Sequence, residues 1–421
     1  MIFSGDDFAC QYTADMDAIV CDISALVYHA TPPILREASL DEAPLAHAMC
    51  VSALSRARFS ALPEVRAVRE HLLGPLKAVP TPIHLLSPGI VHGSTDFVQW
   101  HSHSNELVPD DLMRIADGVS VLTPAAALRH LAHGLSTVPL TQILFELCGL
   151  YGICPETQRS KAALDVLQAS GALPRSAGRW SAYYGADGRP LSFPDAASSS
   201  TIWELCLRED GSRSDLWRRP PLLKSEELWR LCETLGEDRA SKRLRRALEF
   251  AQPGSGSPWE TITAMLLSLP RKMGGEGLPC PQLNRRVLVS DARGSGARGF
   301  VLDGCWDVRT RWPQGIVPAK ALARAREFGL SILPCTLEVD GAAFHRGRTA
   351  FTRDSERRTA LAHAGIATQP VSPAQVNNVV LWDEWVDVLA SELGFERVPP
   401  TSAFLRQRAR LRKTLLSRDI L

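Results

Sequence analysis

The sequence predicts a mixed α/β (α+β) fold divided into more than one domain. The chain has 421 residues, enough for two or three domains, and its 45% apolar and 22% charged residues are typical of globular proteins. Short segments with apolar residues at alternate positions predict strands, and longer segments with apolar residues three and four apart predict helices. Both kinds of segment occur along the chain, so we expect sheets covered by helices.

The charge is unevenly distributed although the net charge is only +1. Residues 1–256 contain 24 Lys+Arg and 30 Asp+Glu, a net charge of −6, whereas residues 257–421 contain 23 and 16, a net charge of +7. The C-terminal part is therefore the better candidate for contact with a polyanion such as DNA.

The ten cysteines are scattered and form no Cys-x-x-Cys pair, which argues against a zinc cluster or a compact disulfide framework. We expect buried free thiols in a reducing compartment. The N-terminus has no secretory pattern, and no run of about 20 apolar residues is present, so we expect a cytoplasmic protein without a membrane partner.

Residues 1–169 predict an N-terminal α+β domain. The apolar segment 18–28 fits either a strand or a buried helix, because its periodicity does not distinguish them. Further strands are expected at 81–86, 96–103 and 118–122, and helices at 45–59, at 64–73, after Thr123 and at 140–151.

Two histidines, His101 and His103, lie on one face of the strand expected at 96–103. They could bind a metal, but no further ligands are evident, so surface or packing histidines are the other interpretation.

The composition changes twice before the second domain. Residues 170–222 are rich in Gly, Ser, Pro and Ala and predict a linker or a loosely structured region. Residues 223–252 predict a helical connection with leucines along one side. We place the main domain boundary near residue 252.

Residues 257–395 predict a second domain with the order helix, two strands, an inserted segment, strand, helix, strand, helix. Ser257 caps the first helix, and Glu260 follows three residues later, as in a capping box. Strands at 286–290 and 299–306 predict a β-hairpin.

The remaining residues, 396–421, predict a basic tail. Arg406, Arg410 and Lys413 share one helical face there. This face could follow a DNA backbone, or the helix could simply be solvated.

The segment 337–365 carries the residues that indicate chemistry. It begins with a short strand on which Glu338 and Asp340 alternate, so both carboxylates leave the same face. Two like charges in these positions are unfavourable unless a cation lies between them. His345 follows in a loop, and a helix is expected to begin at Asp354. Carboxylates at a strand end suit a magnesium-dependent phosphodiesterase, because hard oxygen atoms hold the metal that holds the phosphate.

The order of elements and the positions of these acids resemble the very-short-patch-repair (Vsr-like) branch of the PD-(D/E)XK nuclease superfamily. That family has a glutamate on the first helix, an aspartate on a core strand, a Glu-x-Asp-Gly strand followed by a histidine, and then a helix with a spaced aspartate, arginine, leucine and glycine. Over about residues 257–376 this sequence supplies Glu260, Asp303, Glu338, Asp340, Gly341, His345, Asp354, Arg358, Leu361 and Gly365. The resemblance implies a PD-(D/E)XK-like mixed sheet flanked by helices.

A second resemblance lies upstream. Residues 118–132 and 146–152 are similar to the C-terminal part of abortive-infection (AbiEi-type) antitoxins. Residues 257–284 also look like actinobacterial proteins that carry the nuclease-like domain.

The nuclease resemblance implies roles for individual residues. Asp303 and Glu338 would bind Mg²⁺ (or Mn²⁺), and Glu260 would support them or hold a second ion. Asp340 stands where the superfamily usually has lysine, so the general-base or leaving-group role would fall to His345. The residues that would contact DNA phosphates are Arg357, Arg358, Arg346 and Arg348.

These acids also have structural interpretations. Glu260 could only cap its helix, Asp303 could end a strand at a turn, and Asp354 could pair with Arg358 one helical turn later. The family joins its two acidic strands by a tight hairpin, whereas 34 residues separate Asp303 from Glu338 here. Asp307 therefore competes with Asp303 for the role of ligand.

We therefore expect a metal-dependent DNA endonuclease, in defence or repair, with DNA and a protein of a defence or toxin–antitoxin system as partners. The alternative is a catalytically inactive DNA-binding or regulatory protein of the antitoxin type that keeps the nuclease fold as a scaffold. A third hypothesis is an interaction module with an incidental acidic cluster. The enzyme hypothesis requires the carboxylates of Asp303, Glu338 and Glu260 to converge, with His345 at the rim.

Overall fold

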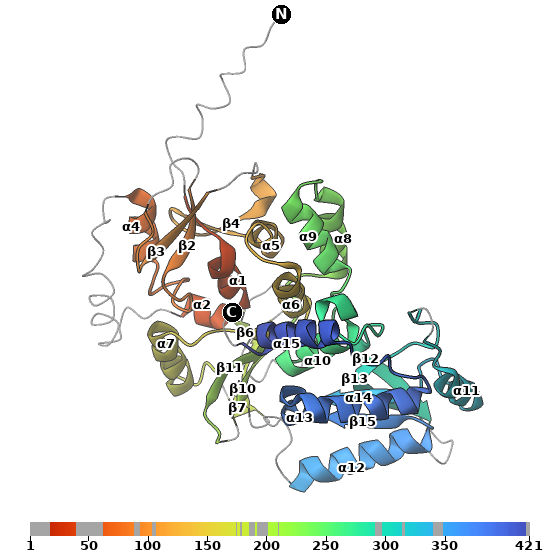
Figure 1. Cartoon of the computed structure of the whole chain (residues 1–421). Coiled ribbons are helices and arrows are strands. Elements are labelled where there is room, and N and C mark those ends of the chain that lie inside the picture. The colour runs from red at the N-terminus through yellow and green to blue at the C-terminus, as the bar shows by residue number, and fades with distance from the viewer. Residues whose placement is uncertain are drawn as a thin grey trace, which may run out of the picture.

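The computed structural model describes residues 17–38, 62–87, 93–102, 107–173, 175–176, 179–184, 190–191, 201–208, 210–290, 297–313, 316–339 and 348–417. Within these residues, helices surround three β-sheets, so the expected mixed α/β class is confirmed (Figure 1). The cysteines of the described part are free and mostly buried, also as expected. No helix in these segments has the length and apolar character needed to cross a membrane.

The first sheet has the strand order β3-β2-β1-β5-β4. Its strands are β1 (Ala18–Val20), β2 (Ile83–Ser87), β3 (Val98–Ser102), β4 (Leu112–Ala116) and β5 (Val119–Leu122). β1 pairs in parallel with β5 and antiparallel with β2, while β2 and β3 are parallel. A parallel pair needs a crossover connection, so this sheet brings together residues far apart in the sequence.

The apolar segment 18–28, left open between strand and helix, contains both. β1 ends before Cys21, and α1 (Asp22–Ala30) starts at Asp22, which has a left-handed φ of 53°. The helices that share its hydrophobic core are α4 (Pro63–Glu70), α5 (Pro124–Leu131), α6 (Thr137–Leu147), α8 (Ser225–Thr234) and α9 (Arg239–Leu248). Thr123 caps α5, as its sequence predicts. The helix expected at 45–59 lies outside the described residues.

The region expected to be a linker contains a second sheet, with the order β6-β11-β10-β8-β7 and β9 paired with β8. Its strands are β6 (Tyr151–Ile153), β7 (Arg175–Ser176), β8 (Arg179–Tyr184), β9 (Pro190–Leu191), β10 (Thr201–Leu207) and β11 (Arg213–Arg218). Trp203, Leu205 and Trp217 are buried against α7 (Gln158–Ala169) in one cluster. The described part of residues 170–222 therefore consists largely of strands, and these buried apolar side chains hold its sheet against α7.

The third sheet forms the core of the C-terminal part, with the order β12-β13-β14-β15. Its strands are β12 (Gln282–Ser290), β13 (Ala297–Cys305), β14 (Cys335–Val339) and β15 (Ala367–Val371). The hairpin of β12 and β13 is present as predicted, and β14 pairs in parallel with β15. The helices of this part are α10 (Pro258–Ser268), α11 (Ala319–Glu327), α12 (Arg348–His363), α13 (Pro373–Asn377), α14 (Val379–Leu393) and α15 (Ser402–Leu416).

The segment between Asp303 and Glu338 does not separate their strands. It contains α11 and returns to the sheet through a bridge between Asp307 and Ile332. β13 and β14 then pair antiparallel, with Gly304 opposite Leu337. The insertion thus lies outside the pairing, and the two acidic strands remain neighbours.

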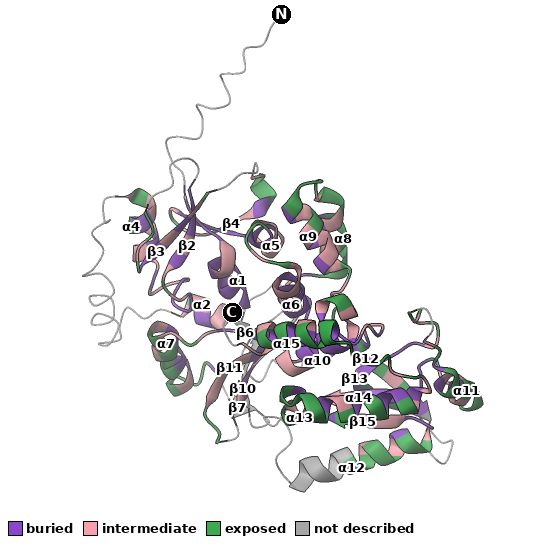
Figure 2. Cartoon of the chain, viewed as in Figure 1, coloured by how far each residue is buried: buried purple, intermediate pink, exposed green. Residues whose placement is uncertain are grey.

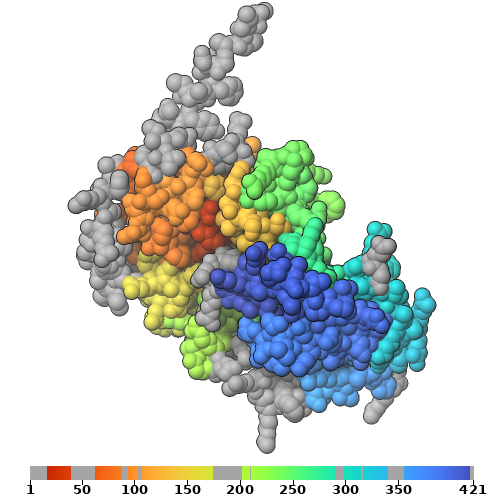
Figure 3. Space-filling model, in the orientation of Figure 1, coloured from red at the N-terminus to blue at the C-terminus, as the bar shows by residue number. Residues whose placement is uncertain are grey.

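The C-terminal tail is a helix packed against the rest of the chain. α15 carries the deepest blue in Figures 1 and 3, where it lies between the N-terminal part and the C-terminal sheet, and it contacts α6 and α10. Figure 2 shows buried and exposed residues alternating along it. Arg406, Arg410 and Lys413 are exposed, as a shared helical face predicts, whereas Arg408 and Arg412 are buried.

Candidate functional site

Glu260 lies at the start of α10 and is buried, with 9% of its surface exposed. Its backbone N–H donates to the Ser257 Oγ at 3.2 Å, so the predicted cap is present. Its carboxylate accepts from the backbone N–H of Gly256 at 2.7 Å and from Asn284 Nδ2 at 2.6 Å. Burial, and then the nearby charge of Asp303, raise the pKa of Glu260 to about 7. Glu260 therefore has its structural role and also lies within the electrostatic influence of Asp303.

Asn284 is a site residue that the sequence analysis missed. It lies in β12 with a φ of 47°, a left-handed value that asparagine tolerates better than most residues. The pairs Leu283–Gly304 and Arg285–Leu302 flank it, which places Asn284 opposite Asp303. The available signal was an asparagine inside a strand, where this residue type is depleted.

Asp303 and Glu338 lie on adjacent strands. Because Gly304 pairs with Leu337 in an antiparallel register, Asp303 is opposite Glu338. Asp303 Oδ2 accepts from the backbone N–H of Val339 at 2.8 Å, which fixes the carboxylate against β14. Both residues are partly buried. The structure thus places these two predicted residues side by side, with Glu260 and Asn284 next to Asp303.

Arg357 reaches the same cluster from α12. Its Nη2 lies 2.7 Å from Glu338 Oε1 and also donates to the backbone carbonyl of Val301. Arg358 is exposed on the same helix. α12 begins at Arg348, so Asp354 is an interior residue of this helix and not its first residue, because the helical pattern continues upstream.

Several predicted residues cannot be placed in the site. Asp340, His345 and Arg346 lie outside the described residues, and Arg348 is described by its backbone in α12 alone. Their predicted roles therefore stay predictions.

Asp307, the competitor of Asp303, is engaged elsewhere. Its Oδ1 accepts from the backbone N–H of Arg309 at 2.8 Å, and its carboxylate pairs with the guanidinium groups of Arg309 and Arg285 at 3.1 and 3.3 Å. The hydrogen bonds from Arg309 lower the pKa of Asp307 to about 2. These partners make Asp307 a structural anion of the turn after β13.

The donor set around Asp303 suits a hard cation. Asp303, Glu338 and Glu260 supply carboxylate oxygens from three elements, and burial first, then the nearby charge of Asp303, raises the pKa of Glu260. Among the described residues, the oxygens of these three carboxylates do not all lie within 4.8 Å of one another. The ligand atoms of Asp22, His84 and His101, in the first sheet, do lie that close together. A cation would have to draw the carboxylates together and displace Arg357 from Glu338.

Of the two histidines expected on one strand face, His101 is described, on β3. His101 is joined by His84 from β2 and by Asp22, both absent from the sequence analysis, whereas His103 lies outside the described residues. His84 is the only histidine of its strand, so no local pattern pointed to it.

Comparison of the chain with protein-family models, with curated proteins and with solved structures finds no match.

Proposed function

We propose that this chain is a metal-dependent nuclease that hydrolyses phosphodiester bonds in DNA at the cluster of Asp303, Glu338 and Glu260. The observation that carries the proposal is the register of β13 and β14, which sets Asp303 opposite Glu338 despite the 34 residues between them. Two carboxylates facing each other across neighbouring strands need a cation beside them; Arg357 provides one at Glu338, and a metal ion between Asp303 and Glu338 would provide another.

Each residue of the cluster would have a distinct role in holding the metal or the phosphate. Asp303 and Glu338 would hold Mg²⁺ or Mn²⁺, and Glu260, oriented by Asn284, would support them. When bound, such an ion neutralises phosphate charge and lowers the pKa of an attacking water. Arg357, displaced from Glu338, would be available to contact a phosphate oxygen. The net charge of +7 on residues 257–421 supports a polyanionic substrate.

The test is cleavage of several DNA forms by the full-length chain in Mg²⁺ or Mn²⁺. We expect Asp303→Asn and Glu338→Gln to lower the rate by about two orders of magnitude or more, as removal of one electrostatic group from an active site does. Asp303→Asn retains an oxygen that can accept from Val339, so the fold is preserved. Asp307→Asn is the matched control, because it removes the same charge four residues away, and it should cleave like the wild type.

Equal cleavage by all four proteins, or none by the wild type in either metal, would remove the nuclease proposal. The second outcome favours the alternative function, a catalytically inactive DNA-binding scaffold. The ion pair between Arg357 and Glu338 favours this alternative, because it already neutralises the charge of one proposed metal ligand. The inactive DNA-binding alternative would then be identified by DNA binding that depends on salt, does not change with added Mg²⁺ and leads to no cleavage.

A further inference from the structure

A cluster of histidines lies in the first sheet, away from the carboxylates of the nuclease proposal. His84 is on β2 and His101 on the parallel neighbour β3, where Leu86 is opposite His101. The two histidines are thus diagonal neighbours on one face of the sheet. His84 Nδ1 lies 2.9 Å from His101 Nε2, and the two rings are stacked with centroids 4.9 Å apart.

Asp22 brings a carboxylate to the same place. Its Oδ1 lies 3.5 Å from His84 Nδ1, and its Oδ2 lies 3.9 Å from His101 Nδ1. A φ of 53° costs energy for a residue that carries a side chain, and here it directs the first residue of α1 towards the two histidines. The backbone N–H of Ile23 donates to Asp22 Oδ1 at 2.7 Å and fixes the carboxylate.

We propose that Asp22, His84 and His101 form a binding site for a divalent transition metal of the zinc class. One donor atom from each residue lies within 4.8 Å of the other two. Zinc bonds of about 2.0–2.1 Å in tetrahedral geometry set donor atoms about 3.3 Å apart. The observed distances from His84 Nδ1 are close to this value, 2.9 Å to His101 Nε2 and 3.5 Å to Asp22 Oδ1. The third distance, 3.9 Å, joins Asp22 Oδ2 to the other ring nitrogen of His101, Nδ1, so coordination of one ion by all three groups requires the His101 ring or the Asp22 carboxylate to rotate.

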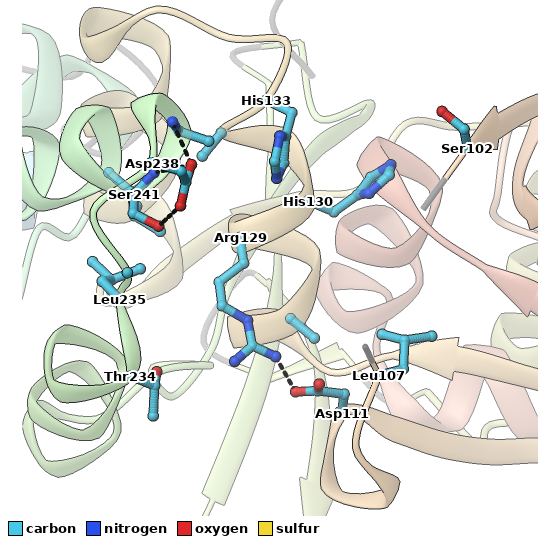
Figure 4. Close-up of a pocket in the computed structure, with 15 residues that line it drawn as sticks. Ser102, Leu107, Asp111, Arg129, His130, His133, Thr234, Leu235, Asp238 and Ser241 are labelled. Carbon is cyan, nitrogen blue, oxygen red and sulfur yellow. Dashed lines mark hydrogen bonds and ion pairs between the residues drawn. The ribbon is translucent and has the colours of Figure 1, made fainter. Parts of the chain in front are cut away.

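His130 is the candidate for the fourth ligand, and it also lines a cavity. His130 Nε2 lies 3.9 Å from Asp22 Oδ2, and its ring packs edge-on against His101. His130 also lines a cavity of about 430 Å³ between α5 and the α8–α9 pair. In Figure 4 the His130 ring is directed towards the faint red helix α1, whereas the Arg129 side chain extends away from it to pair with Asp111. His130 thus lies between the proposed metal site and this cavity, which Asp22, His84 and His101 do not line.

Ligand chemistry separates this site from the carboxylate cluster. Imidazole nitrogens favour Zn²⁺ and other late first-row metals, whereas Mg²⁺ prefers carboxylate and water oxygens. Side-chain exposures of 15% for His84 and 21% for His101 leave the donors reachable from solvent. The two sites should therefore bind different metals independently.

The experiment is metal titration of the full-length chain after removal of metal with a chelator. We expect one Zn²⁺ to bind per chain, and Co²⁺ to give the visible absorption of a low-coordinate nitrogen-ligated site. Loss of a residue that only hydrogen-bonds to a metal ligand weakens metal binding ~10–100-fold. His84→Gln and His101→Gln remove a ligand itself and should weaken Zn²⁺ binding by more than this. His133→Gln is the matched control, because His133 is exposed and lines the same cavity without approaching Asp22.

Three outcomes would overturn the proposal: no Zn²⁺ or Co²⁺ binding by the wild type, equal affinity in the wild type and His101→Gln, or loss of binding in Asp303→Asn but not in His84→Gln. The first two would make the cluster a hydrogen-bonded histidine pair, and the third would place the metal at the carboxylates. Circular dichroism checks that each variant is folded. The Co²⁺ spectrum of the wild type tests the site even if a variant fails to fold.

Discussion

Glu146 is a carboxyl group whose burial should govern part of the pH dependence of stability. It lies in α6, is 7% exposed, and accepts from the backbone N–H of Ile153 at 2.9 Å. Burial raises its pKa to about 7, against the opposing effects of Arg219 and of this hydrogen bond. Arg219 donates to the backbone carbonyl of Glu146 at 3.0 Å, so the guanidinium is held beside the helix end.

The sign of the pH effect follows from the raised pKa. Between about pH 4.5, the ordinary value, and about pH 7, the folded state holds a proton that the unfolded state has released. The contribution of Glu146 to stability is therefore fully present below pH 4.5 and is lost as the pH rises to about 7, by about 3 kcal/mol in all. Glu146→Gln keeps an oxygen that can accept from Ile153 and removes the ionisation that causes this loss of stability.

We expect the stability of Glu146→Gln relative to the wild type to rise by about 3 kcal/mol between pH 4.5 and 7.5. Urea unfolding at both pH values measures it. Glu237→Gln, at a side chain 81% exposed, should show no such change. The same pH response in both variants would contradict the assignment to Glu146.

At the scale of elements, α15 is held by arginines that are buried in ion pairs. Arg408 Nη1 and Nη2 lie 2.6 and 3.0 Å from the two oxygens of Asp383 on α14, a bidentate pair. Glu276, 3% exposed at its side chain, lies 3.7 Å from Arg408 and 2.8 Å from Arg397. The Arg271 guanidinium lies 4.0 Å from the centre of the Phe404 ring. The basic composition of this helix is thus partly structural.

We expect Arg408→Ala to destabilise the protein by on the order of 3 kcal/mol, because Glu276 and Asp383 lose a buried partner. Arg410→Ala, on the exposed face of the same helix, should change the free energy of unfolding by about 0.5 kcal/mol or less. Denaturant unfolding of the two variants checks this, and equal effects would show that burial of Arg408 is unimportant. If the exposed arginines contact DNA, Arg410→Ala should instead reduce the salt dependence of DNA binding.

At the scale of the whole molecule, the two largest hydrophobic cores meet on one helix. Leu144 of α6 belongs to the core of the first sheet, and the next residue, Phe145, belongs to the core of the third sheet. The Tyr151 hydroxyl and Thr261 Oγ1, 2.9 Å apart, add a buried contact between β6 of the second sheet and α10 of the C-terminal part. A helix shared in this way should couple the unfolding of both cores.

Truncation of the shared residue tests this coupling. Phe145→Ala removes a fully buried ring and should cost about 3–5 kcal/mol. Hydrogen exchange should then accelerate in both α1 and α14, which lie in different cores. Leu361→Ala, in the small cluster under α12, should affect exchange mainly around that helix. Loss of protection confined to the C-terminal part in Phe145→Ala would show that the cores unfold separately.

Local patterns in the sequence determined much of the C-terminal fold. Ser257 with Glu260 predicted the start of α10, and alternating residues predicted the hairpin of β12 and β13, because capping and strand periodicity act over a few residues. The acids of β13 and β14 were also identified from sequence. The second sheet was missed because turn-forming residues outnumber its alternating apolar ones, and their burial depends on packing against α7.

The tertiary structure alone decided which of these residues meet. Strand register sets Asp303 against Glu338 and Asn284, and parallel pairing sets His101 beside His84, 17 positions away, with Asp22 beside both. Register and crossover depend on which apolar faces pack together, and no local periodicity records that choice. The sequence by itself therefore determined the local elements and the chemical types of the candidate ligands, whereas long-range packing determined their partners.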